Sequence, residues 1–139
     1  MSDNWVQDME NFHNHHGVRQ AVSYLDEEQL HQFLVFRLAF LKEELDETFK
    51  AFKEKDEEEI VDGLIDLCVV AIGTLDLFKV DASKAWNEVL RANVTKEVGI
   101  KPERPNPLGL PDLIKPAGWK APYHGGNTGI LSQATTRKK

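Results

Sequence analysis

Residues 43–66, EELDETFKAFKEKDEEEIVDGLID, contain the strongest pattern of the chain. Two pairs of carboxylates, each with i,i+3 spacing, lie in it: Glu44 with Glu47, and Glu59 with Asp62. This spacing puts both members of a pair on the same face of a helix, one turn apart. The Lys- and Glu-rich segment between the pairs, with its KEKD, is typical of a turn between antiparallel helices. Such a hairpin would bring the four carboxylates to one place.

The segment before this turn has the apolar spacing of one long helix, about residues 27–53, with Asp26 as a suitable N-cap. At about 100° per residue its apolar side chains form two stripes. The first stripe holds Leu30, Leu34, Leu38, Leu41, Leu45, Phe49 and Phe52, and the second holds Phe33, Phe36, Phe40 and Ala51. Glu44 and Glu47 lie on the second face. A helix with two apolar faces needs two partners, and we expect one of them to come from another chain.

The segment after the turn predicts a second helix, about residues 56–78. Its acids and a glycine fall on one side, namely Glu59, Asp62, Asp66 and Gly73, whereas apolar residues cover most of the remainder. Acids inside so apolar a helix are costly to bury unless they are paired or bound to a metal. Gly73 costs about 1 kcal/mol relative to Ala in a helix interior, so we expect a neighbouring helix or a ligand to approach it closely.

The rest of the chain adds two helices and an extended arm. A short amphipathic helix is expected over residues 3–14, and after a connection the fourth helix is expected from Asp81 or Ser83 to about Glu97, ended by Gly99. Six prolines from Pro102 onward forbid regular helix. No β-strand is expected, so the fold class is all-α with four main helices.

Three segments follow from this pattern. We expect a helical domain over residues 1–100, an extended Pro-rich arm over residues 101–124 that packs on it through Trp119 and Tyr123, and a flexible tail over residues 125–139. A chain of 139 residues is ordinarily one domain with a real core.

The composition narrows the class of protein. A net charge of −6 argues against non-specific binding to nucleic acid, and the lone Cys68 excludes an internal disulfide or a Cys-rich zinc site. The N-terminus is polar, unlike a signal peptide, and the most apolar run is too short and too acidic to span a bilayer. We expect a protein of the cytoplasm, or of the host cytoplasm if a phage encodes it.

The acids predict a metal site. Carboxylates without clustered Cys or His suit a hard cation such as Mg²⁺ or Mn²⁺. We expect Glu44, Glu47, Glu59 and Asp62 to be ligands, with Asp66 as a further ligand or as a residue that orients one. The alternative, acids on a solvated helix surface, is favoured for the other carboxylates of the stretch.

Two other groupings admit different interpretations. Glu10 with His13 and Glu28 with His31 both read Glu-x-x-His, as in di-iron bundles, but His13 and the histidines after it are more often a polar helix end. Asn93 and Lys96 lie one helical turn apart. This spacing admits two interpretations, a contact with a nucleotide or an exposed polar face. No Gly-rich phosphate loop is present.

The pattern EELDE followed by EIVD resembles the E-E-x-x-E … E-x-x-D signature of the all-α nucleoside triphosphate pyrophosphatases. This superfamily includes the MazG-like proteins, the phosphoribosyl-ATP pyrophosphohydrolases and the dimeric dUTPases. DGLIDLCVVAIGTL, RANVTK and LPDLIKPAGWKAPYH are similar to segments of small MazG-like proteins of phages and bacteria. The resemblance covers about residues 5–124. It implies a four-helix bundle completed by formation of a homodimer or homotetramer.

The resemblance also implies an activity. It implies cleavage of a nucleoside triphosphate, by family analogy a purine deoxynucleotide, between its α- and β-phosphates with two or three Mg²⁺ or Mn²⁺ ions per site. It implies that the four acids above bind the metal ions, with Glu43 as a helper, and that Glu44 or Glu47 activates the water. It also implies that Asn93 and Lys96 contact the nucleotide. Trp5 and Phe12 are expected walls for the base. The alternatives are phosphoribosyl-ATP hydrolysis and a non-enzymatic helical protein that oligomerises or binds a partner.

Overall fold

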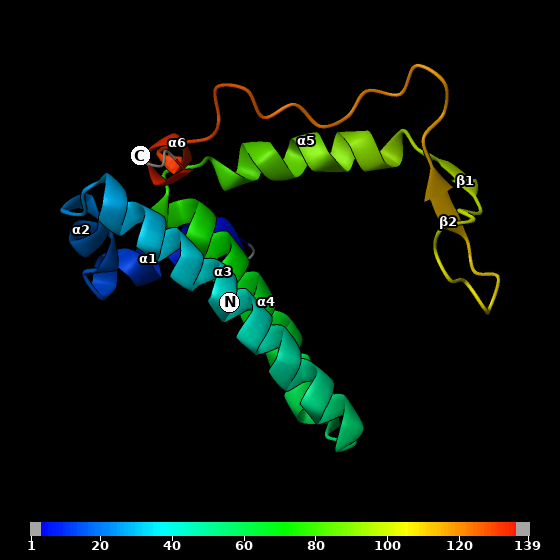
Figure 1. Cartoon of the computed structure of the whole chain (residues 1–139), viewed down its shortest axis with the longest axis horizontal. Coiled ribbons are helices and arrows are strands. Elements are labelled where there is room, and N and C mark those ends of the chain that lie inside the picture. The colour runs from blue at the N-terminus through cyan, green and yellow to red at the C-terminus, as the bar shows by residue number, and fades with distance from the viewer. Residues whose placement is uncertain (1–3, 136–139) are drawn as a thin grey trace. The chain divides into compact units, whose positions relative to one another are not determined.

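A computed structural model describes residues 4–135 of the chain. It is mostly helical, with one sheet of two short antiparallel strands (Figure 1). The elements in chain order are α1 (Trp5–His15), α2 (Val18–Ser23), α3 (Glu27–Lys53), α4 (Glu57–Leu77), α5 (Ala82–Val94), β1 (Glu97–Gly99), β2 (Asp112–Ile114) and α6 (Leu131–Thr135). The all-α class is therefore confirmed, and the two helices predicted on either side of the acidic turn are α3 and α4.

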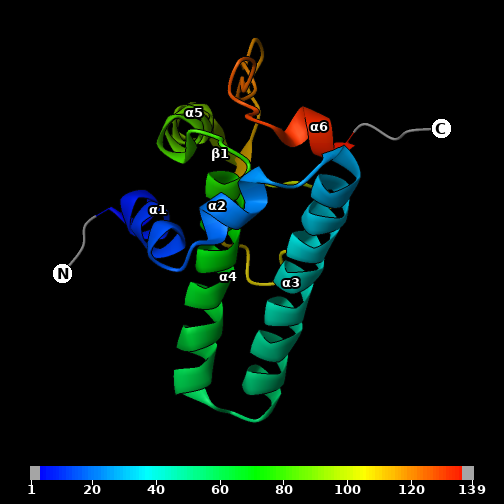
Figure 2. The same cartoon turned by 90° about the vertical axis from the view of Figure 1, so that its left-hand side faces the viewer.

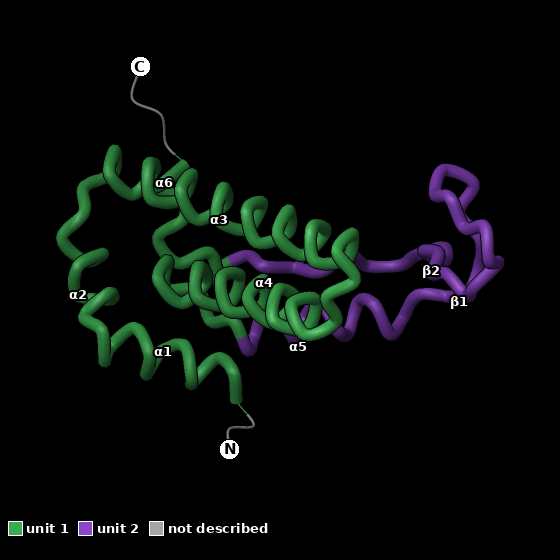
Figure 3. Tube along the Cα trace, turned by 90° about the horizontal axis from the view of Figure 1, so that it is seen from below, with its two compact units in different colours: residues 1–82, 126–139 green, residues 83–125 purple. Residues whose placement is uncertain are grey.

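The described residues form two compact units (Figure 3). Unit 1 contains the residues up to 82 and those from 126 onward, and unit 2 contains residues 83–125. Unit 1 therefore holds α1 to α4 and α6, and unit 2 holds α5 from its second residue together with both strands. The domain bounds expected from the sequence, 1–100 and 101–124, stay a prediction.

Helices α3 and α4 pack along each other as an antiparallel hairpin (Figure 2). The Asp26 side chain accepts from the Gln29 backbone N–H at 2.8 Å, and Gln29 Oε1 accepts from the Asp26 N–H at 3.0 Å, which completes a capping box. Asp56 caps α4 by accepting from the Glu59 N–H at 3.1 Å. Between the helices Lys55 has a positive φ of 58°, which makes the reversal tight. The expected turn at KEKD is confirmed.

The core of unit 1 includes the end of the chain. Phe78 is fully buried and stacks on Phe33 with ring centroids 5.8 Å apart. Around it lie the buried side chains of Val22, Leu30, Leu77 and Ala134. Ala134 belongs to α6, and its carbonyl accepts a hydrogen bond of 2.7 Å from His31 Nδ1.

The expected flexible tail from residue 125 therefore needs correction. The Asn127 side chain bonds the backbone N–H and carbonyl of Asp81 at 2.8 and 2.9 Å, and the Ile130 N–H donates to the Phe78 carbonyl at 2.8 Å. Apolar residues at 130, 131 and 134 then fill the core beside α3. Five helical residues are too few to give a clear periodicity, so sequence alone did not reveal α6. Residues 136–139 of the expected tail lie outside the described range.

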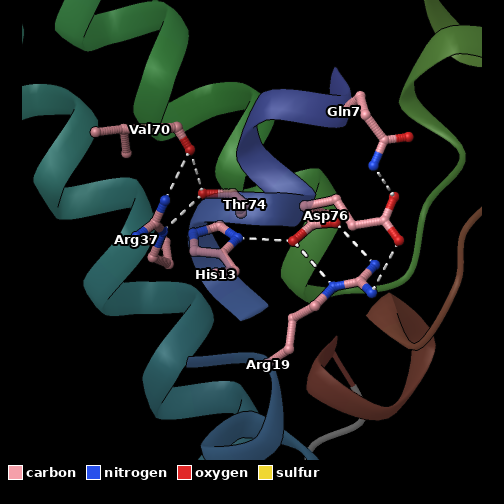
Figure 4. Close-up of polar contacts among 8 residues, drawn as sticks. Gln7, His13, Arg19, Arg37, Val70, Thr74 and Asp76 are labelled. Atoms are coloured by element: carbon pink, nitrogen blue, oxygen red, sulfur yellow. Dashed lines mark hydrogen bonds and ion pairs between the residues drawn. The ribbon is translucent and has the colours of Figure 1, made fainter. Parts of the chain in front are cut away.

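A buried polar network ties α1 and α2 to α4 (Figure 4). The Asp76 carboxylate accepts from His13 Nδ1 at 2.7 Å and from the Arg19 guanidinium at 2.9 and 3.3 Å. His13 is only 3% exposed. His13 is thus part of the interior rather than of a polar helix end. The segment from 18 to 23, expected as a plain connection, is helix α2 and supplies Arg19.

Gly73 lies where three helices meet. A Cβ on Gly73 would come within 3.2 Å of Met9 and His13 on α1 and within 2.9 Å of Arg37 on α3. Arg37 donates to Thr74 Oγ1 at 2.9 Å and to the Val70 carbonyl at 3.0 Å, and burial lowers the pKa of its guanidinium (Figure 4). The expected close approach at Gly73 is confirmed, and the approaching groups are protein side chains.

Unit 2 departs from the sequence expectation in three places. Helix α5 ends at Val94 rather than near Glu97, and Gly99 lies in a strand instead of ending the helix. Strand β1 pairs with β2, which lies inside the Pro-rich arm between two prolines. Strands of three residues are too short to show alternation, which explains why no strand was expected. Tyr123 is 76% exposed, so its side chain does not pack as predicted.

Candidate metal and nucleotide site

The α3–α4 hairpin carries all six predicted metal ligands. Helix α3 supplies Glu43, Glu44 and Glu47, and helix α4 supplies Glu59, Asp62 and Asp66. Glu44 and Asp66 are half-buried and the other four are exposed. The site is thus an open surface of the hairpin in a single chain.

The electrostatics show which carboxylates the fold brings together. Partial burial raises the pKa of Glu44, and the negative charges of Glu47, Asp66, Glu43 and Asp62 raise it further. Partial burial likewise raises the pKa of Asp66, together with the charge of Asp62 and a hydrogen bond between these two side chains. Glu44 on α3 and the Asp62–Asp66 pair on α4 therefore repel one another across the hairpin.

Glu59 is the exception among the six. It is not among the charges that raise the pKa of Glu44 or of Asp66. Its backbone N–H donates to the side chain of the N-cap Asp56. Glu59 is therefore in the first turn of α4, close to the turn that joins α3 and α4. Its role as a ligand stays a prediction.

Gly63, which the acidic pattern does not include, allows the two helices to approach closely at the acids. Gly63 on α4 faces Thr48 on α3, and a Cβ on Gly63 would overlap with Thr48 Oγ1. That hydroxyl donates to the Glu44 carbonyl at 2.8 Å, so it stays close to the α3 backbone. Gly63 directly follows Asp62 in the chain, and the only signal for it was a glycine in a helix interior.

We expect Gly63→Ala to destabilise the protein by about 1–3 kcal/mol, because the added methyl group needs space that Thr48 fills. Urea unfolding measures this change. Thr48→Ala in the same background removes Oγ1, so the double variant should recover part of the loss. Equal stability of Gly63→Ala and the parent protein would contradict the close approach described here.

The donor set fits a hard divalent cation. None of the six carboxylates forms an ion pair within residues 4–135, whereas their neighbours Asp46 and Glu54 pair with Lys42 and Lys50. In the same range no three metal-ligating side chains already converge on one point. Oxygen donors that repel one another and lack a cationic partner are the kind that Mg²⁺ or Mn²⁺ would neutralise. The ligand assignment and the cofactor stay predictions.

Apolar side chains near the acids are exposed in the single chain. Helix α4 leaves Val61, Leu64 and Ile65 about half exposed or more. The same holds for the first stripe of α3, where Leu38, Leu45, Phe49 and Phe52 are exposed. The acids are therefore bordered by apolar surface rather than buried in it.

The predicted nucleotide contacts lie on α1, on α5 and in the connection that follows α5. Trp5 is 54% exposed and lines a cavity of about 220 Å³ with Met9 of α1 and Ile65, Cys68, Val69 and Ile72 of α4. Phe12 is 51% exposed and packs edge-on against the rings of His13 and His16, outside that lining. Asn93 and Lys96 belong to unit 2.

The family model that matches this chain is that of phosphoribosyl-ATP pyrophosphohydrolase, over residues 9–93. The matched stretch is more than half of the chain and runs from α1 through α5, with all six acids inside it. The chain belongs to the phosphoribosyl-ATP pyrophosphohydrolase family. No curated protein and no solved structure matches it.

Membership confirms the resemblance to the MazG-like all-α pyrophosphohydrolases. It makes the protein a hydrolase of the nucleotide pyrophosphohydrolase class, which cleaves phosphoanhydride bonds. Asn93 is the last matched residue, whereas Trp5 and Lys96 lie outside the match. No helix within the described range is long and apolar enough to cross a membrane.

The di-iron alternative is not supported by the contacts of this pyrophosphohydrolase. Glu10 pairs with Arg19 at 3.4 Å, and His13 binds Asp76. His31 is engaged with the Ala134 carbonyl. These bonds hold the helices of unit 1 together, so Glu10 and both histidines of the two Glu-x-x-His groups have structural partners.

Proposed function

We propose that this member of the family is a metal-dependent nucleoside triphosphate pyrophosphohydrolase that releases a nucleoside monophosphate and pyrophosphate. The observation that carries the proposal is the crowding of Glu44, Asp62 and Asp66 across the hairpin without a cationic partner. Bare carboxylates repel a triphosphate, so a site built from them needs cations between protein and substrate. By family analogy the substrate is a deoxynucleotide with a purine base.

The residues have distinct roles in the proposed reaction. Glu44, Glu47, Glu59, Asp62 and Asp66 would hold Mg²⁺ or Mn²⁺, with Glu43 beside them. When bound, such ions neutralise phosphate charge and lower the pKa of a bound water. Glu44 or Glu47 orients the attacking water and takes its proton as the new bond to the α-phosphorus forms. The bond from the α-phosphorus to the bridging oxygen breaks, and Lys96 offsets the charge on the departing pyrophosphate.

Phosphoribosyl-ATP is the second candidate substrate, because the family model that matches this chain bears the name of the enzyme that hydrolyses it. Its scissile bond is of the same kind, so the acids and the water would have the same roles. The two candidates differ in the size of the group attached to the triphosphate. That difference concerns Trp5, Phe12 and the cavity beside α1 rather than the carboxylates.

The assembly is part of the proposal. The first stripe of α3 leaves large apolar side chains exposed, including Leu38, Phe49 and Phe52. Large contiguous apolar surface of this kind usually marks a contact with another protein chain. We propose a homodimer or homotetramer in which this surface is covered.

A substrate panel tests the function. The protein is incubated with each common nucleoside and deoxynucleoside triphosphate and with phosphoribosyl-ATP, with Mg²⁺ or Mn²⁺, and the products are separated by chromatography. We expect monophosphate and pyrophosphate from at least one triphosphate. Diphosphate and orthophosphate would show that the wrong bond was assigned. Turnover of phosphoribosyl-ATP alone would establish the second candidate.

A further inference from the structure

The indole of Trp119 is held in a fixed position within unit 2. Residues 116–119 form a turn in which the Trp119 N–H donates to the Pro116 carbonyl at 3.0 Å, and Gly118 supplies the positive φ of 75°. The indole Nε1–H donates to the Ala92 carbonyl at 2.8 Å. That carbonyl is in the last turn of α5 and also accepts from the Thr95 hydroxyl at 2.9 Å. Trp119 therefore ties the Pro-rich arm to the end of α5.

Two lysines converge on this ring. The Nζ atoms of Lys96 and Lys115 lie 5.3 and 5.2 Å from the centroid of Trp119. The strand register explains why, because β1 and β2 pair Glu97 with Ile114, and Lys96 and Lys115 are the next residues outward on the two antiparallel chains. A cation at this distance from an aromatic ring is attracted to the face of the ring. The fold thus brings two ammonium groups to one indole.

No carboxylate of unit 2 forms an ion pair with either lysine in the part of the chain that the structure describes. Glu88 pairs with Arg91 at 2.9 Å, and Asp112 pairs with Arg104 at 3.0 Å. Neither Lys96 nor Lys115 makes an ion pair with any residue in the range 4–135. Unit 2 has Lys or Arg at seven positions and Asp or Glu at four, which leaves it with three net positive charges in a chain of net charge −6. Two lysines without a counter-charge therefore lie in the basic unit of an acidic protein.

We infer that Lys96, Lys115 and Trp119 form a binding site for a diphosphate group. A diphosphate carries at least two negative charges on separate phosphate groups. Two lysine ammonium groups can therefore bind a diphosphate better than they bind a single carboxylate, which has one negative charge. The inference rests on the proposed function, by which this group is the β,γ-diphosphate of the nucleotide and afterwards the pyrophosphate product. Lys115 is thereby a substrate-binding residue, and it lies outside the stretch that matches the family.

Titration of the full-length protein with inorganic pyrophosphate, without added metal, tests this site. The indole N–H signal of Trp119, identified with Trp119→Phe, is followed by NMR. We expect a saturable shift in the parent protein and a dissociation constant about tenfold higher or more in Lys115→Ala and in Lys96→Ala. Lys115→Arg, which keeps the charge, should restore most of the affinity. Lys120→Ala removes an exposed charge from the same segment and should bind pyrophosphate like the parent protein.

The outcomes separate this inference from the proposed function. An unshifted Trp119 signal, or equal weakening by Lys115→Ala and Lys120→Ala, would overturn the site even if nucleotides are hydrolysed. Specific weakening by Lys115→Ala in a protein that hydrolyses no nucleotide would keep the site and remove the assigned source of its diphosphate. For an active protein, Lys115→Ala should raise KM for the nucleotide about tenfold. An unchanged KM would contradict a contact with substrate and leave only free pyrophosphate as the ligand.

Discussion

Glu47→Gln and Asp62→Asn are each expected to reduce turnover by about 100-fold or more while the protein stays folded. Each change keeps the shape of the side chain and removes one negative oxygen donor from the hairpin. Loss of a group that merely orients a metal ligand already costs about 10- to 100-fold, so loss of a ligand itself should cost more. The measurement is the rate of pyrophosphate release from the best substrate of the panel. Near-normal turnover in either variant would remove it from the proposed site.

The unfolding temperature of the same variants distinguishes loss of a metal ligand from loss of structure. The charge of Glu47 raises the pKa of Glu44, which means that the two carboxylates repel each other in the folded chain. Without metal, Glu47→Gln should therefore unfold at the same temperature as the parent protein or higher. With Mg²⁺ the parent protein should gain stability and the variant should gain little, because a ligand that binds only the folded state raises its unfolding temperature.

Asp46→Asn is the matched control. Asp46 precedes Glu47 on α3, is exposed and pairs with Lys42, so its loss should change neither turnover nor the response to Mg²⁺. If the parent protein itself shows no response to Mg²⁺ or Mn²⁺, the acids serve solubility rather than metal binding. That result would favour the non-enzymatic alternative of an oligomerising or binding protein.

The α3–α4 hairpin could be predicted from sequence because its signals are local. Asp26 and Asp56 are caps that act on backbone groups three residues away, and the long apolar stripes repeat over many turns. The carboxylate pairs depend only on their i,i+3 spacing and on the turn between the helices. For the same reason, Glu44 and Asp62 could be assigned to one surface before the structure was known.

Contacts between residues far apart in the chain could not be predicted. Asp76 lies 63 residues from His13 and 57 from Arg19, and nothing near Asp76 in the sequence shows that it has these partners. Lys96 and Lys115 reach the same Trp119 ring because two three-residue strands pair, and these strands are too short for alternation to be visible. Short elements and single long-range contacts depend on tertiary packing, and a pattern in one segment does not contain that information.

Asp76→Ala is expected to destabilise the protein by about 3–5 kcal/mol, measured by urea unfolding, because it removes one partner of a buried charged network. The Asp76 side chain is 6% exposed, and its two oxygens bind His13 of α1 and Arg19 of α2. Arg19 is 37% exposed and can turn to water, whereas His13 remains enclosed with its Nδ1 unpaired. Most of the loss of stability should therefore come from the buried, unpaired His13 and from weaker attachment of α1 to α4.

The stability losses from substitutions at His13 and at Asp76 should not be additive, because the two side chains are partners in one buried contact. His13→Leu combined with Asp76→Leu replaces the buried pair by apolar groups and leaves no polar atom of the pair unsatisfied, so the double variant should lose less stability than Asp76→Ala alone. Asp46→Ala removes a carboxylate from an exposed pair and should cost less than about 1 kcal/mol. A similarly small loss for Asp76→Ala would show that His13 finds another partner, and the attachment of α1 would then have to rest on Met9 and its apolar neighbours on α4.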